Sequence, residues 1–131
     1  MIKSYKDLKV WEAGMEMAVA VYRATGQFPK PEVFGLVSQM RRAASSVPAN
    51  IAEGFSRQHK TEFTQYLHIA AGSLSELRTH LCLSERLGFL GSEEAALLEE
   101  QADAIGRMLH GLIRTLRKYQ PTKPGRRPTD D

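Results

Sequence analysis

Apolar residues recur every three or four positions through four segments of the chain, which is the spacing of one face of a helix. Asp7 can cap the first segment, which runs from Leu8 to about Thr25. This segment carries two neighbouring apolar stripes: Leu8, Trp11, Met15, Ala18 and Tyr22 form the first, and Val10, Met17 and Val21 form the second. Two interpretations fit. Either the two stripes are one wide core face, or one of them packs inside the protein and the other against another subunit.

The second helical segment is predicted to begin near Pro31 or Glu32, and small side chains dominate its centre, residues 38–57. Pro48 lacks an amide hydrogen and crowds the carbonyl of Ala44, so we expect a kink or a break there. The segment is therefore one long bent helix or two short helices in line. Its expected core face consists of Phe34, Val37, Ala44, Ile51 and Phe55.

The third segment opens at Thr61 or Lys60 and keeps an unbroken heptad spacing: Phe63, Leu67, Ala70, Leu74, Leu77 and Leu81. Gly72 lies inside it, where glycine costs about 1 kcal/mol relative to alanine. That cost predicts a close contact at Gly72, with the small-residue patch Ala43–Ala52 as its partner. Gly88 is expected to cap this helix.

The fourth segment opens at Ser92 and has its own core stripe: Leu98, Ala102, Ile105, Leu109, Leu112 and Leu116. Four long amphipathic segments with short links predict an all-α, up-down-up-down four-helix bundle with a bent second helix. We expect residues 1–119 to form one domain. Residues 120–131 contain three prolines, one glycine and no large apolar side chain, which predicts a flexible, disordered tail.

Composition narrows the class of protein without naming an activity. The 131 residues are 42% hydrophobic and 25% charged, as in ordinary soluble domains. Cys82 is the single cysteine, which excludes an internal disulfide and a multi-cysteine zinc site. No apolar run approaches the ~18 residues of a membrane span, so we expect a cytoplasmic protein with no membrane contact. The net charge of +3 permits an anionic partner without requiring one.

The chain offers little for catalysis or metal binding. No glutamate precedes a histidine by three residues, the spacing that di-iron bundles use, and only Glu76 precedes His80 by four. Cys82 lies between leucines and is interpreted as a packed residue. Glu53 and Glu76 adjoin the small-residue patches near arginines, which favours salt bridges between helices. We therefore predict no enzyme, no cofactor, no metal and no small-molecule substrate.

Several motifs resemble the bacterial 23S rRNA-intervening sequence protein family. They are Asp7–Trp11, Phe28–Pro29, Gly35–Leu36 with Gln39, Arg42–Gly54, Ile69–Ser73 and Glu76–Leu77. The resemblance implies a left-handed four-helix bundle, a homopentameric ring, and structural roles for the motif residues Trp11, Arg42, Pro48, Asn50, Glu53, Gly54, Gly72, Ser73 and Glu76. Its relatives include basic accessory proteins of diversity-generating retroelements, to which nucleic-acid binding is ascribed.

Three hypotheses of function follow. The first is a non-enzymatic, self-associating scaffold that binds RNA or a nucleoprotein partner through basic residues: Arg41, Arg42, Arg57, Lys60, Arg114, Arg117 and Lys118. The second is a pure protein–protein interaction module with no nucleic-acid binding. The third, an enzyme, requires Glu53, Glu76 and His80 to converge in a cavity.

Overall fold

The computed structural model describes residues 2–118, and within that range it contains helices and no strand. Short 3₁₀ turns at Tyr5–Asp7 (η1) and Lys30–Glu32 (η2) accompany four α-helices: α1, Lys9–Thr25; α2, Leu36–Ser56; α3, Lys60–Arg86; and α4, Ser92–Lys118. The predicted all-α fold of four helices is confirmed. The tail predicted for residues 120–131 lies outside the described residues.

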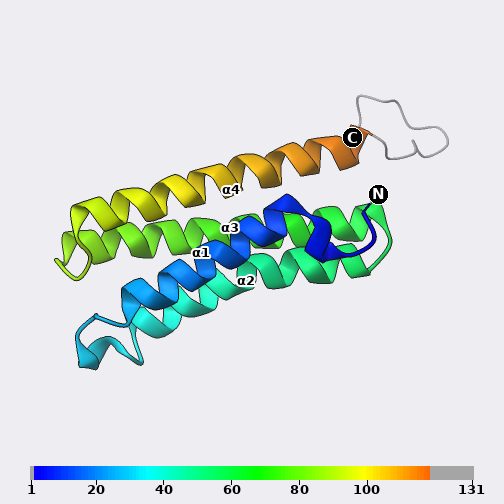
Figure 1. Ribbon diagram of the computed structural model, residues 1–131. Helices are drawn as coiled ribbons and strands as arrows, with labels where there is room; N and C mark the ends of the chain where they lie inside the picture. The colour runs from blue at the N-terminus through cyan, green and yellow to red at the C-terminus, as the bar shows by residue number, and fades with distance from the viewer. Residues whose placement is uncertain (1, 119–131) are drawn as a thin grey trace.

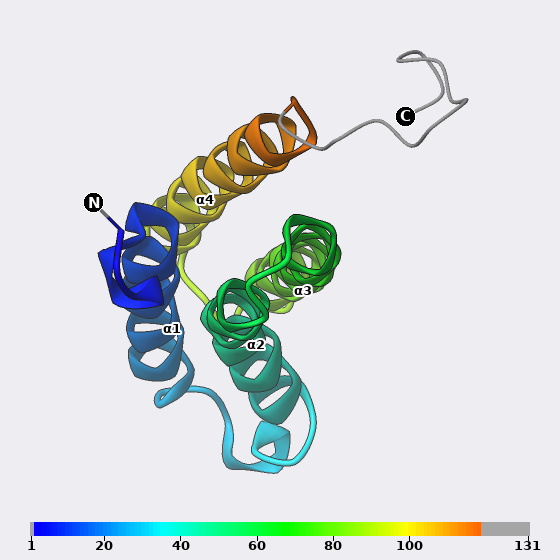
Figure 2. The same cartoon turned by 90° about the vertical axis from the view of Figure 1, so that its right-hand side faces the viewer.

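Successive helices run in opposite directions in Figure 1. Each helix packs on its neighbours in the sequence, and α1 also packs on α4, whereas the Cα atoms of the diagonal pairs, α1 with α3 and α2 with α4, stay more than 8 Å apart. The interface between α2 and α3 is the most extensive, and that between α1 and α4 is the least extensive of the four. Seen along the bundle, α2 lies between α1 and α3 (Figure 2). The left-handedness of the bundle stays a prediction.

The first helix buries the stripe that we did not expect to be its main core face. Val10, Met17 and Val21 are buried, whereas Met15 and Tyr22 are largely exposed. The assignment of Met15 and Tyr22 to the core was therefore wrong. Ala18 and a glycine, Gly14, join the buried face, so small residues bring α1 close to its neighbours.

The second helix begins later than predicted, at Leu36, because residues 30–32 form the separate turn η2. Phe34 consequently lies in the link before α2 and is 95% exposed, so its assignment to the core face was wrong. The helix is continuous through Pro48, which excludes two short helices in line. Pro48 is buried against Gly14, where an added Cβ would lie 3.4 Å from the proline Cδ. Whether α2 is bent stays a prediction.

The third helix confirms the heptad stripe, since its members from Leu67 to Leu81 are buried. The predicted close contact at Gly72 is wrong: an added Cβ there would have no neighbour within 4 Å, because this residue faces outward. The tight contact between α2 and α3 lies at Gly54 instead. A Cβ at Gly54 would lie 2.6 Å from the Cβ of Tyr66 and 3.0 Å from the Cδ1 of Phe63.

The link between α3 and α4 depends on Gly88, as predicted. Its φ of +79° lies in the left-handed region, which favours glycine. The Gly88 amide donates to the Glu85 carbonyl at 3.0 Å, and the Phe89 amide donates to the Ser84 carbonyl at 2.9 Å. This pair of bonds is the Schellman motif, which ends α3 and allows the chain to turn into α4.

Candidate interaction surfaces

A row of polar side chains lies along the junction of α2 and α3, and we call it the polar seam. Its members are Arg42, Ser46 and Asn50 of α2 with Ser73 and Glu76 of α3. The hydroxyls of Ser46 and Ser73 are 2.8 Å apart, and the Asn50 amide donates to the Ser46 hydroxyl at 2.9 Å. These bonds join the small-residue patch Ala43–Ala52 of α2 to the small residues Ala70–Ser73 of α3 and fix the register of the two helices. A hollow of about 490 Å³ lies along the seam at Arg42 and Glu76.

Arg57 lies directly after α2 and links the end of that helix to the beginning of α3. Its guanidinium donates to Glu53 Oε1 at 3.0 Å and to the Tyr66 hydroxyl at 2.9 Å, and it lies 3.9 Å from Glu62. The hydrogen bond to Glu53 is the largest cause that raises the pKa of Arg57 above its ordinary value, and the charge of Tyr66 adds to it. The prediction that Glu53 and Glu76 form salt bridges between helices was wrong: Glu53 pairs with Arg57 at the end of its own helix, and Glu76 lies beside His80 on α3, each with a residue four positions on.

Arg41 joins α2 to the last turn of α1. Its Nε donates to Thr25 Oγ1 at 2.9 Å, and an Nη donates to the Tyr22 carbonyl at 3.1 Å. The guanidinium also lies over the Tyr22 ring, 4.6 Å from its centroid. Arg41 thus adds a second donor to the Tyr22 carbonyl, which also accepts from the Gly26 amide at 3.2 Å, and a cation at the end of a helix complements the helix dipole.

The other predicted basic residues are exposed and lie in two places. Arg42 is on α2 near its beginning, whereas Lys60, Arg114, Arg117 and Lys118 lie toward the opposite end of the bundle, where α3 begins and α4 ends (Figure 1). There, an Nη of Arg117 is 3.2 Å from His68 Nε2 of α3. This end of the molecule concentrates positive charge.

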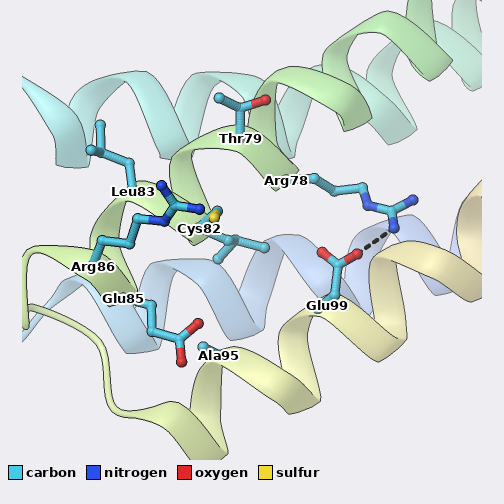
Figure 3. A pocket seen from close by; sticks show the side chains of 9 residues that line it. Arg78, Thr79, Cys82, Leu83, Glu85, Arg86, Ala95 and Glu99 are labelled. Carbon is cyan, nitrogen blue, oxygen red and sulfur yellow. Dashed lines mark hydrogen bonds and ion pairs between the residues drawn. The ribbon is translucent and has the colours of Figure 1, made fainter.

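A hollow of about 670 Å³ lies between α3 and α4 (Figure 3). Arg78 reaches across it to Glu99, to which it donates a hydrogen bond. Cys82 lines the hollow and is exposed, so the interpretation of this thiol as a packed residue was wrong. No histidine lines the hollow to act as a base for the thiol.

The three side chains of the enzyme hypothesis do not converge. Glu53 is bound to Arg57, while Glu76 Oε1 lies 3.6 Å from His80 Nε2 along α3. Both ring nitrogens of His80 are buried without a hydrogen-bond partner. Between residues 2 and 118, no three metal-ligating side chains come together. None of the helices in this range is long and apolar enough to cross a membrane.

Two apolar surfaces remain uncovered. Met15, Val19 and Tyr22 recur along the outer face of α1, and we call them the α1 stripe. On its other side, α1 meets α4 in a groove of about 600 Å³, which we call the α1–α4 groove. Ala20 of α1 lines it together with residues of α4: Glu94, Leu97, Leu98, Glu100, Gln101 and Ala104. Sequence reasoning missed this groove, because it exists only once α1 and α4 are packed.

Comparison with known proteins decides the family. The family model described as 23S rRNA-intervening sequence protein matches residues 6–111. The chain belongs to this family. The match spans all four helices of this family member, up to Gly111 within α4.

A crystal structure of a protein with unknown function, from the S23 ribosomal protein family of Bacteroides thetaiotaomicron, has the same fold. Its TM-score is 0.74 at 24% sequence identity, over 80% of this chain and 95% of that one. No curated protein matches the chain.

The motif residues of this family member are mostly packing and hydrogen-bonding residues. Trp11 packs edge-on against Tyr5, with ring centroids 5.3 Å apart, which fixes η1 on α1. Pro48 rests on Gly14, and Ser73 bonds Ser46. Gly14 was missed as a packing residue, although its position one turn after Val10 places it in the buried stripe.

Proposed function

We propose that this family member is a non-enzymatic scaffold that works by associating with copies of itself. The observation that carries the proposal is the amount of large apolar side chain outside the core. Phe34 is 95% exposed and Leu97 is 64% exposed, and the α1 stripe adds three more residues. Contiguous apolar surface on a soluble protein marks an interaction site, and the three residues of the α1 stripe recur on one face of a single helix.

The free energy gained by burying these apolar side chains can be compared with the free energy that association costs. Burying one large apolar side chain contributes about 1.5–3 kcal/mol. The five side chains are between 39% and 95% exposed, equivalent to about three fully exposed ones, so burying them would contribute roughly 4–9 kcal/mol. That value lies within the lower part of the loss of translational and rotational freedom, estimated at about 4–15 kcal/mol. The remaining stabilisation must come from the other contacts of the interface.

The test is the mass of the native particle by light scattering across a range of protein concentrations. We expect an assembly, with the pentamer that the family resemblance implies as the expected species. Val19→Asp places a charge in the α1 stripe and should weaken the assembly, whereas Ser75→Asp on the exposed face of α3 should not. A stable species of 14.7 kDa at high concentration would refute the proposal.

A second candidate function, binding of RNA or a nucleoprotein, is favoured by the basic end of α4. Arg114, Arg117 and Lys118 are exposed there, and Arg117 lies beside His68. Arg41 and Arg57, by contrast, are engaged within the protein. Phosphate contacts make the affinity fall steeply with salt concentration.

Filter binding of a structured RNA at low and moderate salt tests this second function. Replacing Arg114, Arg117 and Lys118 by alanine should lower the affinity and flatten its salt dependence. The matched control is Arg107→Ala, because Arg107 lies on the same helix but is paired with Asp103. Absence of binding at low salt would leave the alternative, a protein–protein interaction module without nucleic-acid binding.

A further inference from the structure

Phe34 is the most exposed large apolar side chain of the described residues, and we call it, together with the exposed Val33 and Lys30, the Phe34 knob; the three also border a hollow of about 450 Å³. The knob lies in the link between α1 and α2. Its one acid, Glu32, is turned toward the backbone, where the Leu36 amide donates to its carboxylate at 3.4 Å. The knob is therefore an aromatic tip with a positive flank.

The α1–α4 groove has the complementary character. Leu97 and Ala20 line its apolar part, and Glu94 and Glu100 add negative charge. These two carboxylates form no ion pair or hydrogen bond with any residue from 2 to 118. Two other acids on this half of α4 differ, since Glu99 is engaged by Arg78 and Asp103 by Arg107.

We propose that the Phe34 knob of one copy inserts into the α1–α4 groove of the next copy. The phenyl ring would cover Leu97, and Lys30 would approach Glu94 or Glu100. Chemical character and charge favour this pairing, since an exposed aromatic ring beside a cation would meet an apolar groove beside two acids. The inference rests on the proposed self-association, for which it names the two mating surfaces.

One molecule cannot make this contact with itself. Figures 1 and 2 show the link between α1 and α2 on the side of the bundle away from α4. Each copy thus offers one knob and one groove at different places on its surface. Such a contact is heterologous, and its repetition produces a closed ring or an open filament, according to the rotation between neighbouring copies.

Two single variants separate the two halves of the contact. Phe34→Asp removes the knob and leaves the groove intact, while Leu97→Asp does the reverse. Both side chains are exposed, so the variants should fold, which circular dichroism would verify. Ile69→Asp is the matched control, because Ile69 is 51% exposed on α3 and belongs to neither surface.

Light scattering of the full-length proteins gives the result. We expect an assembled wild type and an assembled control, whereas Phe34→Asp and Leu97→Asp are each monomeric at 14.7 kDa. An equimolar mixture of the two variants should form a dimer and nothing larger, because one intact knob then meets one intact groove.

The other outcomes overturn the inference in distinguishable ways. Variants that keep the mass of the wild type would show that these surfaces do not mate, with self-association still standing. A mixture that stays monomeric would exclude the pairing of knob with groove. A wild type that is monomeric at every concentration would remove the proposed function and this inference together.

Discussion

Two glycines in neighbouring helices should respond to the same substitution with opposite signs. Gly54 of α2 lies where α3 comes closest, so the methyl group of Gly54→Ala would lie 2.6 Å from the Cβ of Tyr66 and 3.3 Å from the Phe63 carbonyl oxygen. Neither atom can rotate away, because both are fixed by the backbone of α3. The helices must separate, which also weakens the packing on either side.

The magnitude follows from two opposing contributions. Overpacking of a buried site costs about 1–3 kcal/mol, and contact with backbone-fixed atoms favours the upper end. Alanine recovers about 1 kcal/mol of helix propensity. Gly54→Ala should therefore lower the free energy of unfolding by about 2 kcal/mol. The methyl group of Gly72→Ala would have no neighbour within 4 Å, so only the gain in helix propensity remains. Gly72→Ala should therefore raise the free energy of unfolding by about 1 kcal/mol.

Urea unfolding followed by circular dichroism measures both values. The comparison needs one fixed protein concentration, because association stabilises the folded chain by mass action. Gly72→Ala is the internal control, since it makes the same chemical change in an equally helical backbone. The reasoning fails if Gly54→Ala is as stable as the wild type or if Gly72→Ala is less stable than the wild type.

Three further substitutions test single contacts by the same urea titration. Arg41→Met should lower the free energy of unfolding by about 1–3 kcal/mol because it removes the donor to Thr25 Oγ1 and one of the donors to the Tyr22 carbonyl, and an unchanged value would refute the link. His80→Leu should leave stability unchanged or raise it, because it removes two buried nitrogens that form no hydrogen bond and loses only the 3.6 Å contact with the exposed Glu76; a large loss would mean that this contact is a stabilising ion pair. Ser73→Ala should cost about 1 kcal/mol, since Ser46 loses one bond and keeps the other from α2, and no loss would mean that the seam does not fix register.

The number of helices followed from the sequence because apolar periodicity is local and strong. The stripe from Leu67 to Leu81 has no competitor on α3, and its members are buried as predicted. On α1, two stripes competed, and periodicity alone could not decide between Met17 and Met15. The choice depended on Gly14, which lets Pro48 approach from another helix.

The contacts between helices were harder to predict than the helices. Gly72 and Gly54 look alike in the sequence, because each is a glycine beside small residues inside a helix. Only the packed structure distinguishes them, since the neighbours of Gly54 come from α3. For the same reason, the α1–α4 groove was not predicted, and Phe34 was assigned to a helix that begins two residues later.

The unequal interfaces of the bundle imply an order in which it comes apart. The α2–α3 pair has the largest interface and the hydrogen bonds of the polar seam, so its amides should exchange with deuterium most slowly. The α1–α4 interface is the smallest and joins the two outer segments of the chain, so fluctuations should begin there. If a neighbouring copy fills the α1–α4 groove, it stabilises the bundle at the interface where local opening is easiest. The rigidity of each subunit then depends in part on contact with the next subunit.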